Sequence, residues 1–206
     1  MADTDTPQIY LISPLEFEMQ SFRRQLETVL DAAPVACMRL SMASQDADRI
    51  SRAGDMLREL THARDIPLVI SDHVALAERL GLDGVHLTDG ARAVRTIRKD
   101  LGKEAIIGAF CGASRHDGLN AGEAGADYVA FGPARATGLG HTTPADPELF
   151  GWWSEMIELP VIAEGALDPD TVSSLRDTVD FFALGDEIWQ SEAPEKALSD
   201  YARLID

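Results

Sequence analysis

The chain alternates eight times between a short apolar run and a longer segment whose apolar residues recur every three or four positions. The short runs are typical of buried strands, and the wider spacing is typical of helices with one apolar face. Runs that are apolar throughout indicate strands covered on both faces, as in parallel α/β sheets. The expected strands are Gln8–Ile12, Val35–Leu40, Pro67–Ile70, Gly84–Leu87, Ala105–Ala109, Tyr128–Phe131, Pro160–Ala163 and Phe181–Leu184.

Eight such units favour a closed (β/α)8 TIM barrel, an α/β fold, and 206 residues lie at the lower end of its size range. A doubly wound open sheet is the alternative, because most of these strands would look the same in it. We expect a disordered N-terminal tail over residues 1–7 and a single TIM-barrel domain over residues 8–206. Three helices are expected to begin with a capping residue followed by proline: at Ser13-Pro14, Asp146-Pro147 and Asp168-Pro169.

The composition excludes several classes of partner. The chain has 18 Lys and Arg against 35 Asp and Glu, a net charge of −17, which argues against nucleic-acid binding and against docking on an anionic membrane. Apolar runs stay far short of the roughly 20 residues that a membrane helix needs. The first residues, MADTDTP, do not resemble a signal peptide, and Cys37 and Cys111 have no metal-binding spacing. We therefore expect a cytoplasmic protein.

The residues that directly follow the strands are the candidate site, because TIM barrels place their chemistry in the loops at the C-terminal strand ends. These positions form a ring of polar and small residues around one mouth of the expected barrel. The ring includes Arg39, Ser41, Ser71, Asp72, His86, Asp89, Arg135, Thr137, Glu164, Gly165, Gly185, Asp186 and Glu187.

Five segments carry a resemblance to a known family. They read IYLIS (Ile9–Ser13), VISDHVALA (Val69–Ala77), DGVHL (Asp83–Leu87), GADYVAFGP (Gly125–Pro133) and ELPVIAEG (Glu158–Gly165). In this order and over almost the whole chain, they resemble thiamine-phosphate synthase and its thiazole-tautomerase relatives.

The resemblance implies a transferase that joins a pyrimidine diphosphate to a thiazole phosphate and releases pyrophosphate. Ionisation of the pyrimidine carbon–oxygen bond leaves negative charge on the departing diphosphate, which basic side chains and Mg²⁺ would stabilise. Mg²⁺ prefers carboxylate and phosphate oxygens as ligands. The resemblance also implies a homodimer.

Carried over residue by residue, the resemblance assigns catalytic roles to Arg39, Asp72 and Thr137. Asp72 would bind Mg²⁺, and Asp89 would join it if its loop is rebuilt, since Asp89 sits about two positions early. The residues that would bind substrate or phosphate are Arg39, Ser41, Ser71, His86, Arg135, Thr137, Gly165 and Gly185.

The sequence departs from the family pattern where phosphates are expected. Cys37 and Ser41 replace the family's Gln and diphosphate-binding Lys, and Gly140 and His141 stand where another Lys is expected. At the ends of the seventh and eighth strands the family has small residues, whereas this chain has the acids Glu164, Asp186 and Glu187. A phosphate there would be repelled by like charge unless Arg135 or Arg115 compensates.

Several alternatives stay open. Asp72 could cap the helix that begins near Val74, Arg39 could pair with a barrel carboxylate such as Asp72, and His86 could have a buried structural role. At the level of function, the alternatives are a divergent barrel that binds a different, less phosphorylated ligand, and a tautomerase-like isomerase. The isomerase would need His116 to replace a histidine that this chain lacks after its fifth strand.

Overall fold

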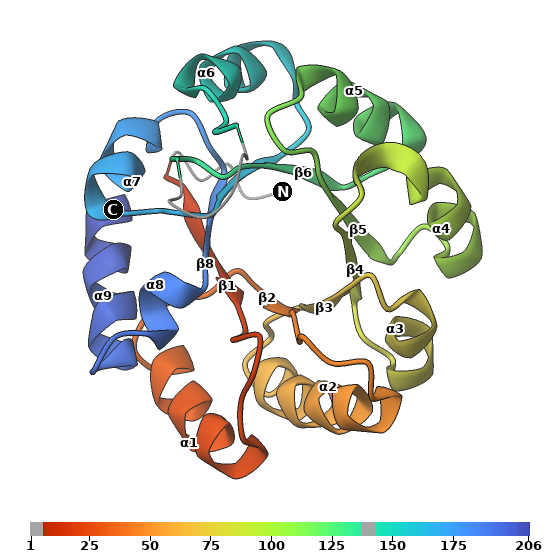
Figure 1. Cartoon of the computed structure of the whole chain (residues 1–206), viewed down its shortest axis with the longest axis vertical. Coiled ribbons are helices and arrows are strands. Elements are labelled where there is room, and N and C mark those ends of the chain that lie inside the picture. The colour runs from red at the N-terminus through yellow and green to blue at the C-terminus, as the bar shows by residue number, and fades with distance from the viewer. Residues whose placement is uncertain (1–5, 137–142) are drawn as a thin grey trace.

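A computed structural model describes residues 6–136 and 143–206. The strands form a closed parallel barrel in chain order, in which β8 pairs with β1 (Figure 1). This topology confirms the predicted (β/α)8 barrel and excludes the open sheet. The strands are β1 (Gln8–Ile12), β2 (Cys37–Leu40), β3 (Leu68–Ser71), β4 (Gly84–Leu87), β5 (Ile106–Phe110), β6 (Tyr128–Phe131), β7 (Val161–Glu164) and β8 (Phe181–Leu184).

Helices surround the strands (Figure 1). The helices are α1 (Met19–Leu30), α2 (Ala47–His62), α3 (Val74–Leu80), α4 (Val94–Leu101), α5 (Arg115–Ala124), α6 (Pro147–Met156), α7 (Pro169–Leu175), α8 (Asp186–Trp189) and α9 (Pro194–Ile205), with a 3-10 turn η1 (Gly90–Arg92). Across residues 6–136 and 143–206, no helix is long and apolar enough to cross a membrane.

Two predicted helix starts are confirmed. The Asp146 carboxylate accepts a hydrogen bond from the Glu148 N–H at the start of α6, and the Asp168 carboxylate accepts one from the Thr171 N–H at the start of α7. In both helices proline follows the capping residue, where its missing N–H leaves no partner unsatisfied.

The predicted start of the first helix is wrong. Glu18 caps α1, and its carboxylate accepts hydrogen bonds from the Gln20 and Ser21 N–H groups. Ser13 is buried instead, and its hydroxyl accepts a hydrogen bond of 3.0 Å from the Ser41 N–H. Ser13 therefore ties the end of β1 to the end of β2.

The barrel has two apolar layers, because successive strand residues point alternately outward and inward. Outward-facing residues pack against the helices, together with large buried side chains such as Phe150 and Trp153 of α6. The inward-facing cluster is smaller and fills the barrel itself. Its buried members are Tyr10, Cys37, Val69, Tyr128, Ala130, Ile162 and Ala183.

A buried hydrogen-bonded chain crosses the barrel interior. The Tyr10 and Tyr128 hydroxyls lie 2.8 Å apart, and the Tyr128 hydroxyl lies 2.9 Å from His86 Nδ1. Burial raises the pKa of both tyrosines. Burial, and then the positive charge of Arg39, hold the pKa of His86 well below its ordinary value. His86 is therefore neutral inside the native barrel.

Gly108 makes room for the Tyr128 ring, since a Cβ at this position would lie 2.0 Å from Tyr128 Cζ. We predict that Gly108→Ala lowers the free energy of unfolding by about 3 kcal/mol, because the surrounding strands cannot move apart. Gly151→Ala in α6 is the matched control, since its Cβ would meet nothing within 4 Å. This variant should be stabilised by about 0.5 kcal/mol. Urea unfolding measures both values, and equal losses would contradict the packing argument.

The neutral state of His86 predicts a pH dependence of stability. The unfolded chain takes up a proton on this imidazole below about pH 6.5, whereas the native protein does not. The free energy of unfolding should therefore fall as the pH decreases from 7 to 5.5, with about 1 kcal/mol of the fall due to His86. Urea titrations of wild type and His86→Gln at both pH values measure this share. Equal losses in the two proteins would contradict it.

Candidate active site

A cavity of about 280 Å³ opens at the C-terminal strand ends, between β1, β2, β7 and β8. We call it the mouth cavity. It brings together four of the residues assigned to substrate from the sequence, Arg39, Ser41, Gly165 and Gly185. The lining residues are Ile12, Ser13, Leu15, Arg39, Ser41, Glu164, Gly165, Ala166, Ala183, Gly185, Asp186 and Glu187.

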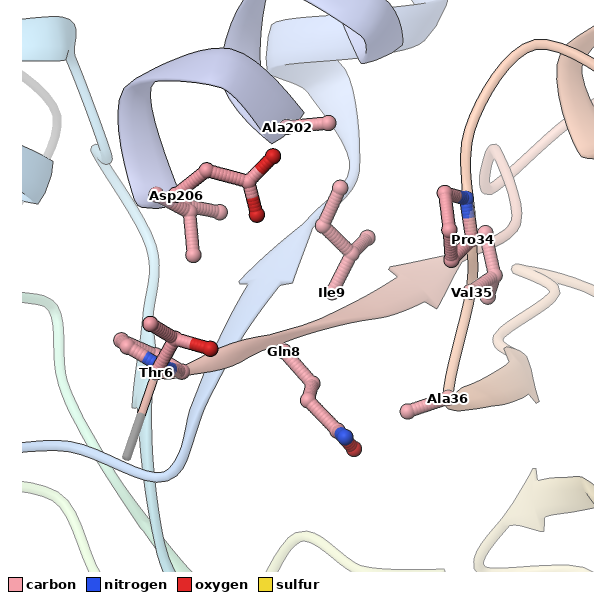
Figure 2. A pocket seen from close by; sticks show the side chains of 10 residues that line it. Thr6, Gln8, Ile9, Pro34, Val35, Ala36, Ala202 and Asp206 are labelled. Carbon is pink, nitrogen blue, oxygen red and sulfur yellow. The ribbon is translucent and has the colours of Figure 1, made fainter. Parts of the chain in front are cut away.

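A larger pocket of about 400 Å³ lies at the other end of the barrel (Figure 2). It forms where β1 begins and the chain enters β2, beside the last residues of α9, and Gln8, Pro34 and Asp206 are among its lining residues. None of the residues assigned from the sequence lines it. TIM barrels place their chemistry at the opposite end, so the smaller mouth cavity is the candidate active site.

A buried ion pair forms the floor of the mouth cavity. Arg39 Nη1 lies 3.0 Å from Glu164 Oε2, and Arg39 Nη2 lies 2.5 Å from Glu164 Oε1. The Arg39 side chain is only 5% exposed. Burial acts to lower the pKa of Arg39, but the Glu164 carboxylate acts to raise it, and the pKa ends above its ordinary value. Arg39 thus pairs with a barrel carboxylate, and the partner is Glu164 rather than Asp72.

This pair corrects the expectation that Arg135 or Arg115 compensates the charge at the seventh strand. Arg135 forms an ion pair with Asp168, the residue that caps α7. The Arg115 guanidinium lies over the Trp152 ring, 4.0 Å from its centroid. Arg39 compensates Glu164 from inside the barrel.

Three buried polar atoms on β2, β3 and β4 have no hydrogen-bond partner within the described residues: Arg39 Nε, Ser71 Oγ and His86 Nε2. Ser71 and His86 are register partners on β3 and β4, so their side chains point to the same face. His86 Nε2 lies 4.0 Å from Glu164 Oε2, beyond hydrogen-bond distance. An unpaired buried polar atom costs about 1–3 kcal/mol, so these atoms are suited to a ligand or an ordered water.

Asp72 and Asp89 follow β3 and β4, which are neighbours in the barrel. Asp72 has a left-handed backbone (φ 57°), and its carboxylate accepts hydrogen bonds from the Thr88 N–H (2.9 Å) and the Thr88 hydroxyl (2.5 Å). It does not cap α3, because His73 occupies the cap position. The alternative role considered for Asp72 is therefore wrong.

The two aspartates are both exposed at the mouth of the barrel. In the part of the chain that the structure describes, no group of three or more His, Cys, Asp and Glu side chains is placed to hold a metal ion. One or two carboxylates nevertheless suit Mg²⁺, which completes its shell with water and substrate phosphates.

Glu187 has a role that the sequence did not reveal. Its carboxylate accepts hydrogen bonds of 3.0 Å from the Leu167 N–H and 3.0 Å from the Gly185 N–H. It therefore bridges the loops that follow β7 and β8. Thr137, assigned to catalysis and substrate binding from the sequence, lies outside the described residues, as do Gly140 and His141.

The Arg39–Glu164 pair generates a stability prediction. Glu164→Ala should lower the free energy of unfolding by about 3 kcal/mol, because it leaves a buried guanidinium without its counterion. Replacing both partners, in Arg39→Leu/Glu164→Ala, should recover part of this loss. Glu59→Ala is the control, since Glu59 holds Arg23 in the same two-bonded geometry on the exposed surface. Urea unfolding would contradict the prediction if Glu59→Ala were as damaging as Glu164→Ala.

Comparison with known proteins places this geometry in a family. Residues 9–188 match the family described as thiamine monophosphate synthase. The thiamine-phosphate synthase of Rhodospirillum centenum is 40% identical over 201 residues, which are 96% of this chain and 97% of that protein. The thiamine-phosphate synthase of Erythrobacter litoralis is 38% identical over 199 residues, 93% of each protein.

Solved structures share the fold. The thiamine phosphate pyrophosphorylase of Pyrococcus furiosus superposes with a TM-score of 0.82 at 24% identity, over 96% of this chain and 95% of that one. The (S)-3-O-geranylgeranylglyceryl phosphate synthase of Thermoplasma acidophilum superposes with a TM-score of 0.71 at 16% identity, over 97% and 93%. The family match includes all residues of the eight strands except Gln8 and all residues that line the mouth cavity, and the chain belongs to the thiamine monophosphate synthase family.

Proposed function

We propose that this protein is a thiamine-phosphate synthase-like transferase that joins a pyrimidine diphosphate to a thiazole phosphate, the family's acceptor, and releases pyrophosphate. The observation that carries the proposal is the family match over residues 9–188, which contains β1 from its second residue, the other seven strands and the residues that line the mouth cavity. Membership at 40% identity over nearly the whole chain supports a transferase role in thiamine biosynthesis.

The reaction makes one demand on the protein, which is to stabilise negative charge on the departing diphosphate. Arg39 is the cation built into the floor of the mouth cavity, and Glu164 fixes its orientation through two hydrogen bonds. The Nε of Arg39 is buried and has no hydrogen-bond partner within the described residues, so we expect the guanidinium to act on the diphosphate through its positive charge. A preorganised guanidinium of this kind stabilises the leaving group without moving during the reaction.

The other residues that the sequence assigns to substrate binding would contact the pyrimidine or the thiazole. Ser71 Oγ and His86 Nε2 would bind the polar atoms of the pyrimidine, while Ser41, Gly165 and Gly185 line the mouth cavity beside the acceptor. Arg135 and Thr137, which follow β6 in the sequence, would contact substrate. These roles are parts of the proposal.

Asp72 and Asp89 would hold Mg²⁺, since their carboxylates follow adjacent strands and are exposed. When bound, the ion would supply positive charge to the diphosphate oxygens. The hydrogen bonds from Thr88 fix the orientation of the Asp72 carboxylate toward this role. A cytoplasmic location and a homodimer complete the proposal.

A second candidate is a family barrel that binds a less phosphorylated ligand. The observation that favours it is the charge of the mouth cavity, where the described lining residues bring the carboxylates of Glu164, Asp186 and Glu187 together with one guanidinium, that of Arg39.

Incubation of the purified protein with both substrates and Mg²⁺ tests the transferase directly. Thiamine phosphate detected by chromatography and mass spectrometry is the expected result, and no product above blank beside an active family enzyme would overturn the proposal. Asp72→Asn should lower kcat at least about 100-fold, because one charge that orients the metal is lost. Asp100→Asn, on the exposed outer surface of α4, should keep wild-type kcat. Equal kcat values for the two variants would remove Asp72 from the mechanism.

A further inference from the structure

Two large apolar side chains within residues 6–136 and 143–206 are exposed to solvent, those of Leu15 and Met156. Leu15 follows β1, is 57% exposed and lines the mouth cavity. Met156 is the last residue of α6 and does not line that cavity. Single exposed apolar residues are common on protein surfaces. An exposed leucine in the lining of a candidate active site, however, offers a surface that a ligand can cover.

The backbone fixes Leu15 at the mouth of the barrel. The Ser13 N–H donates a hydrogen bond of 2.9 Å to the Arg39 carbonyl, and the Ser13 hydroxyl accepts one from the Ser41 N–H. The Leu15 carbonyl accepts a hydrogen bond of 2.8 Å from the Ala43 N–H. The segment after β1 is thereby tied to β2 and to the segment after it. A ligand that covers Leu15 therefore meets a surface whose backbone is already ordered, which lowers the entropic cost of binding.

The lining of the mouth cavity has an apolar part and a charged part. Among the described lining residues, the large apolar side chains are those of Ile12 and Leu15, both at the end of β1. Ile12 packs against the inner apolar cluster, and a Cβ at Gly185 would lie 3.5 Å from Ile12 Cβ. The charged part includes the ion pair of Arg39 with Glu164. The cavity therefore suits a ligand that combines an uncharged ring with charged groups.

The proposed acceptor is such a ligand. Its thiazole ring is flat, aromatic and uncharged, so its transfer from water to an apolar surface is favourable, whereas a phosphate needs hydrogen-bond donors or cations. The proposed function places the pyrimidine at Ser71 and His86, which do not line the mouth cavity. The ring that reaches Leu15 is therefore the thiazole.

We infer that Leu15 is a specificity-determining residue that packs, together with Ile12, on the thiazole ring of the acceptor. The inference rests on the proposed transferase function, to which it adds the residue that recognises the uncharged part of the acceptor. Leu15 takes no part in the breaking or forming of bonds, so its contact stabilises the bound acceptor and the transition state equally. Loss of this contact should change the KM for the acceptor and leave kcat unchanged.

Steady-state kinetics with thiazole phosphate as the varied substrate, at saturating pyrimidine diphosphate and Mg²⁺, test this split. Leu15→Ala should raise the KM for thiazole phosphate about tenfold, as expected when the contact of a partly covered leucine side chain is lost. The KM for pyrimidine diphosphate and kcat should keep their wild-type values. An unchanged KM for thiazole phosphate, or a loss confined to kcat, would overturn the inference.

Two further variants are controls. Leu15→Met keeps an apolar side chain of similar volume and should keep the wild-type KM. Met156→Ala removes the other exposed apolar side chain, outside the mouth cavity, and should keep it too. All three variants should unfold at the urea concentration of wild type, because the replaced side chains are exposed. A KM for thiazole phosphate raised as much in Met156→Ala as in Leu15→Ala would contradict a specific contact.

Calorimetric titration with thiazole phosphate, in the presence of pyrophosphate and Mg²⁺, separates the inference from the proposed reaction. Wild type should bind about tenfold more tightly than Leu15→Ala. Its heat-capacity change on binding should also be more negative, because more apolar surface is buried. If no product forms but these differences hold, the transferase proposal fails and the role of Leu15 stands. Equal affinities in the two proteins, or no binding by wild type, would overturn the inference.

Discussion

Closure of the barrel determines what the interior can contain. Because β8 pairs with β1, every inward-facing side chain must be packed or hydrogen-bonded by side chains from the other strands. Deep in the barrel this is achieved by the bonded Tyr10 and Tyr128 hydroxyls, with Gly108 leaving space for a ring. Nearer the mouth, Arg39 is buried to a degree that requires a counterion, and β7 supplies it in Glu164. The floor of the candidate active site is therefore also part of the barrel core.

The excess of acidic residues has different consequences on the outer helices and at the mouth of the barrel. On the outer helices, pairs such as Arg23 with Glu59 are exposed and contribute mainly to solubility. At the mouth, by contrast, individual carboxylates are held by specific partners: Glu164 by Arg39, Asp72 by Thr88, and Glu187 by two backbone N–H groups. A carboxylate held in this way has a fixed direction. The excess of acids therefore shapes the cavity, and it is no argument against activity as such.

The fold could be predicted from the sequence because apolar runs and helical spacing act locally, and the strands begin or end within two residues of their predicted positions. The start of the first helix could not be predicted, because a Ser-Pro pair has the chemistry of a helix start, while Ser13 is used to tie two strand ends together. The partner of Arg39 could not be predicted either, because several strands end in polar residues and only the folded barrel shows that Glu164 of β7 faces Arg39. The left-handed backbone of Asp72 and the two contacts of Glu187 are set by loop conformation, and sequence spacing carries no signal for either.

The mouth cavity holds two groups of hydrogen-bond donors, and carboxylates of the chain itself engage both of them. At one, Arg39 is a fixed cation whose carboxylate partner orients it and leaves its Nε unpaired. At the other, the backbone donors are satisfied by Glu187, which is covalently part of the protein and always present. A ligand anion that bound these two N–H groups would first have to displace this carboxylate. The order of the mouth cavity thus comes from pairs within the chain, one between β2 and β7 and one between the loops that follow β7 and β8.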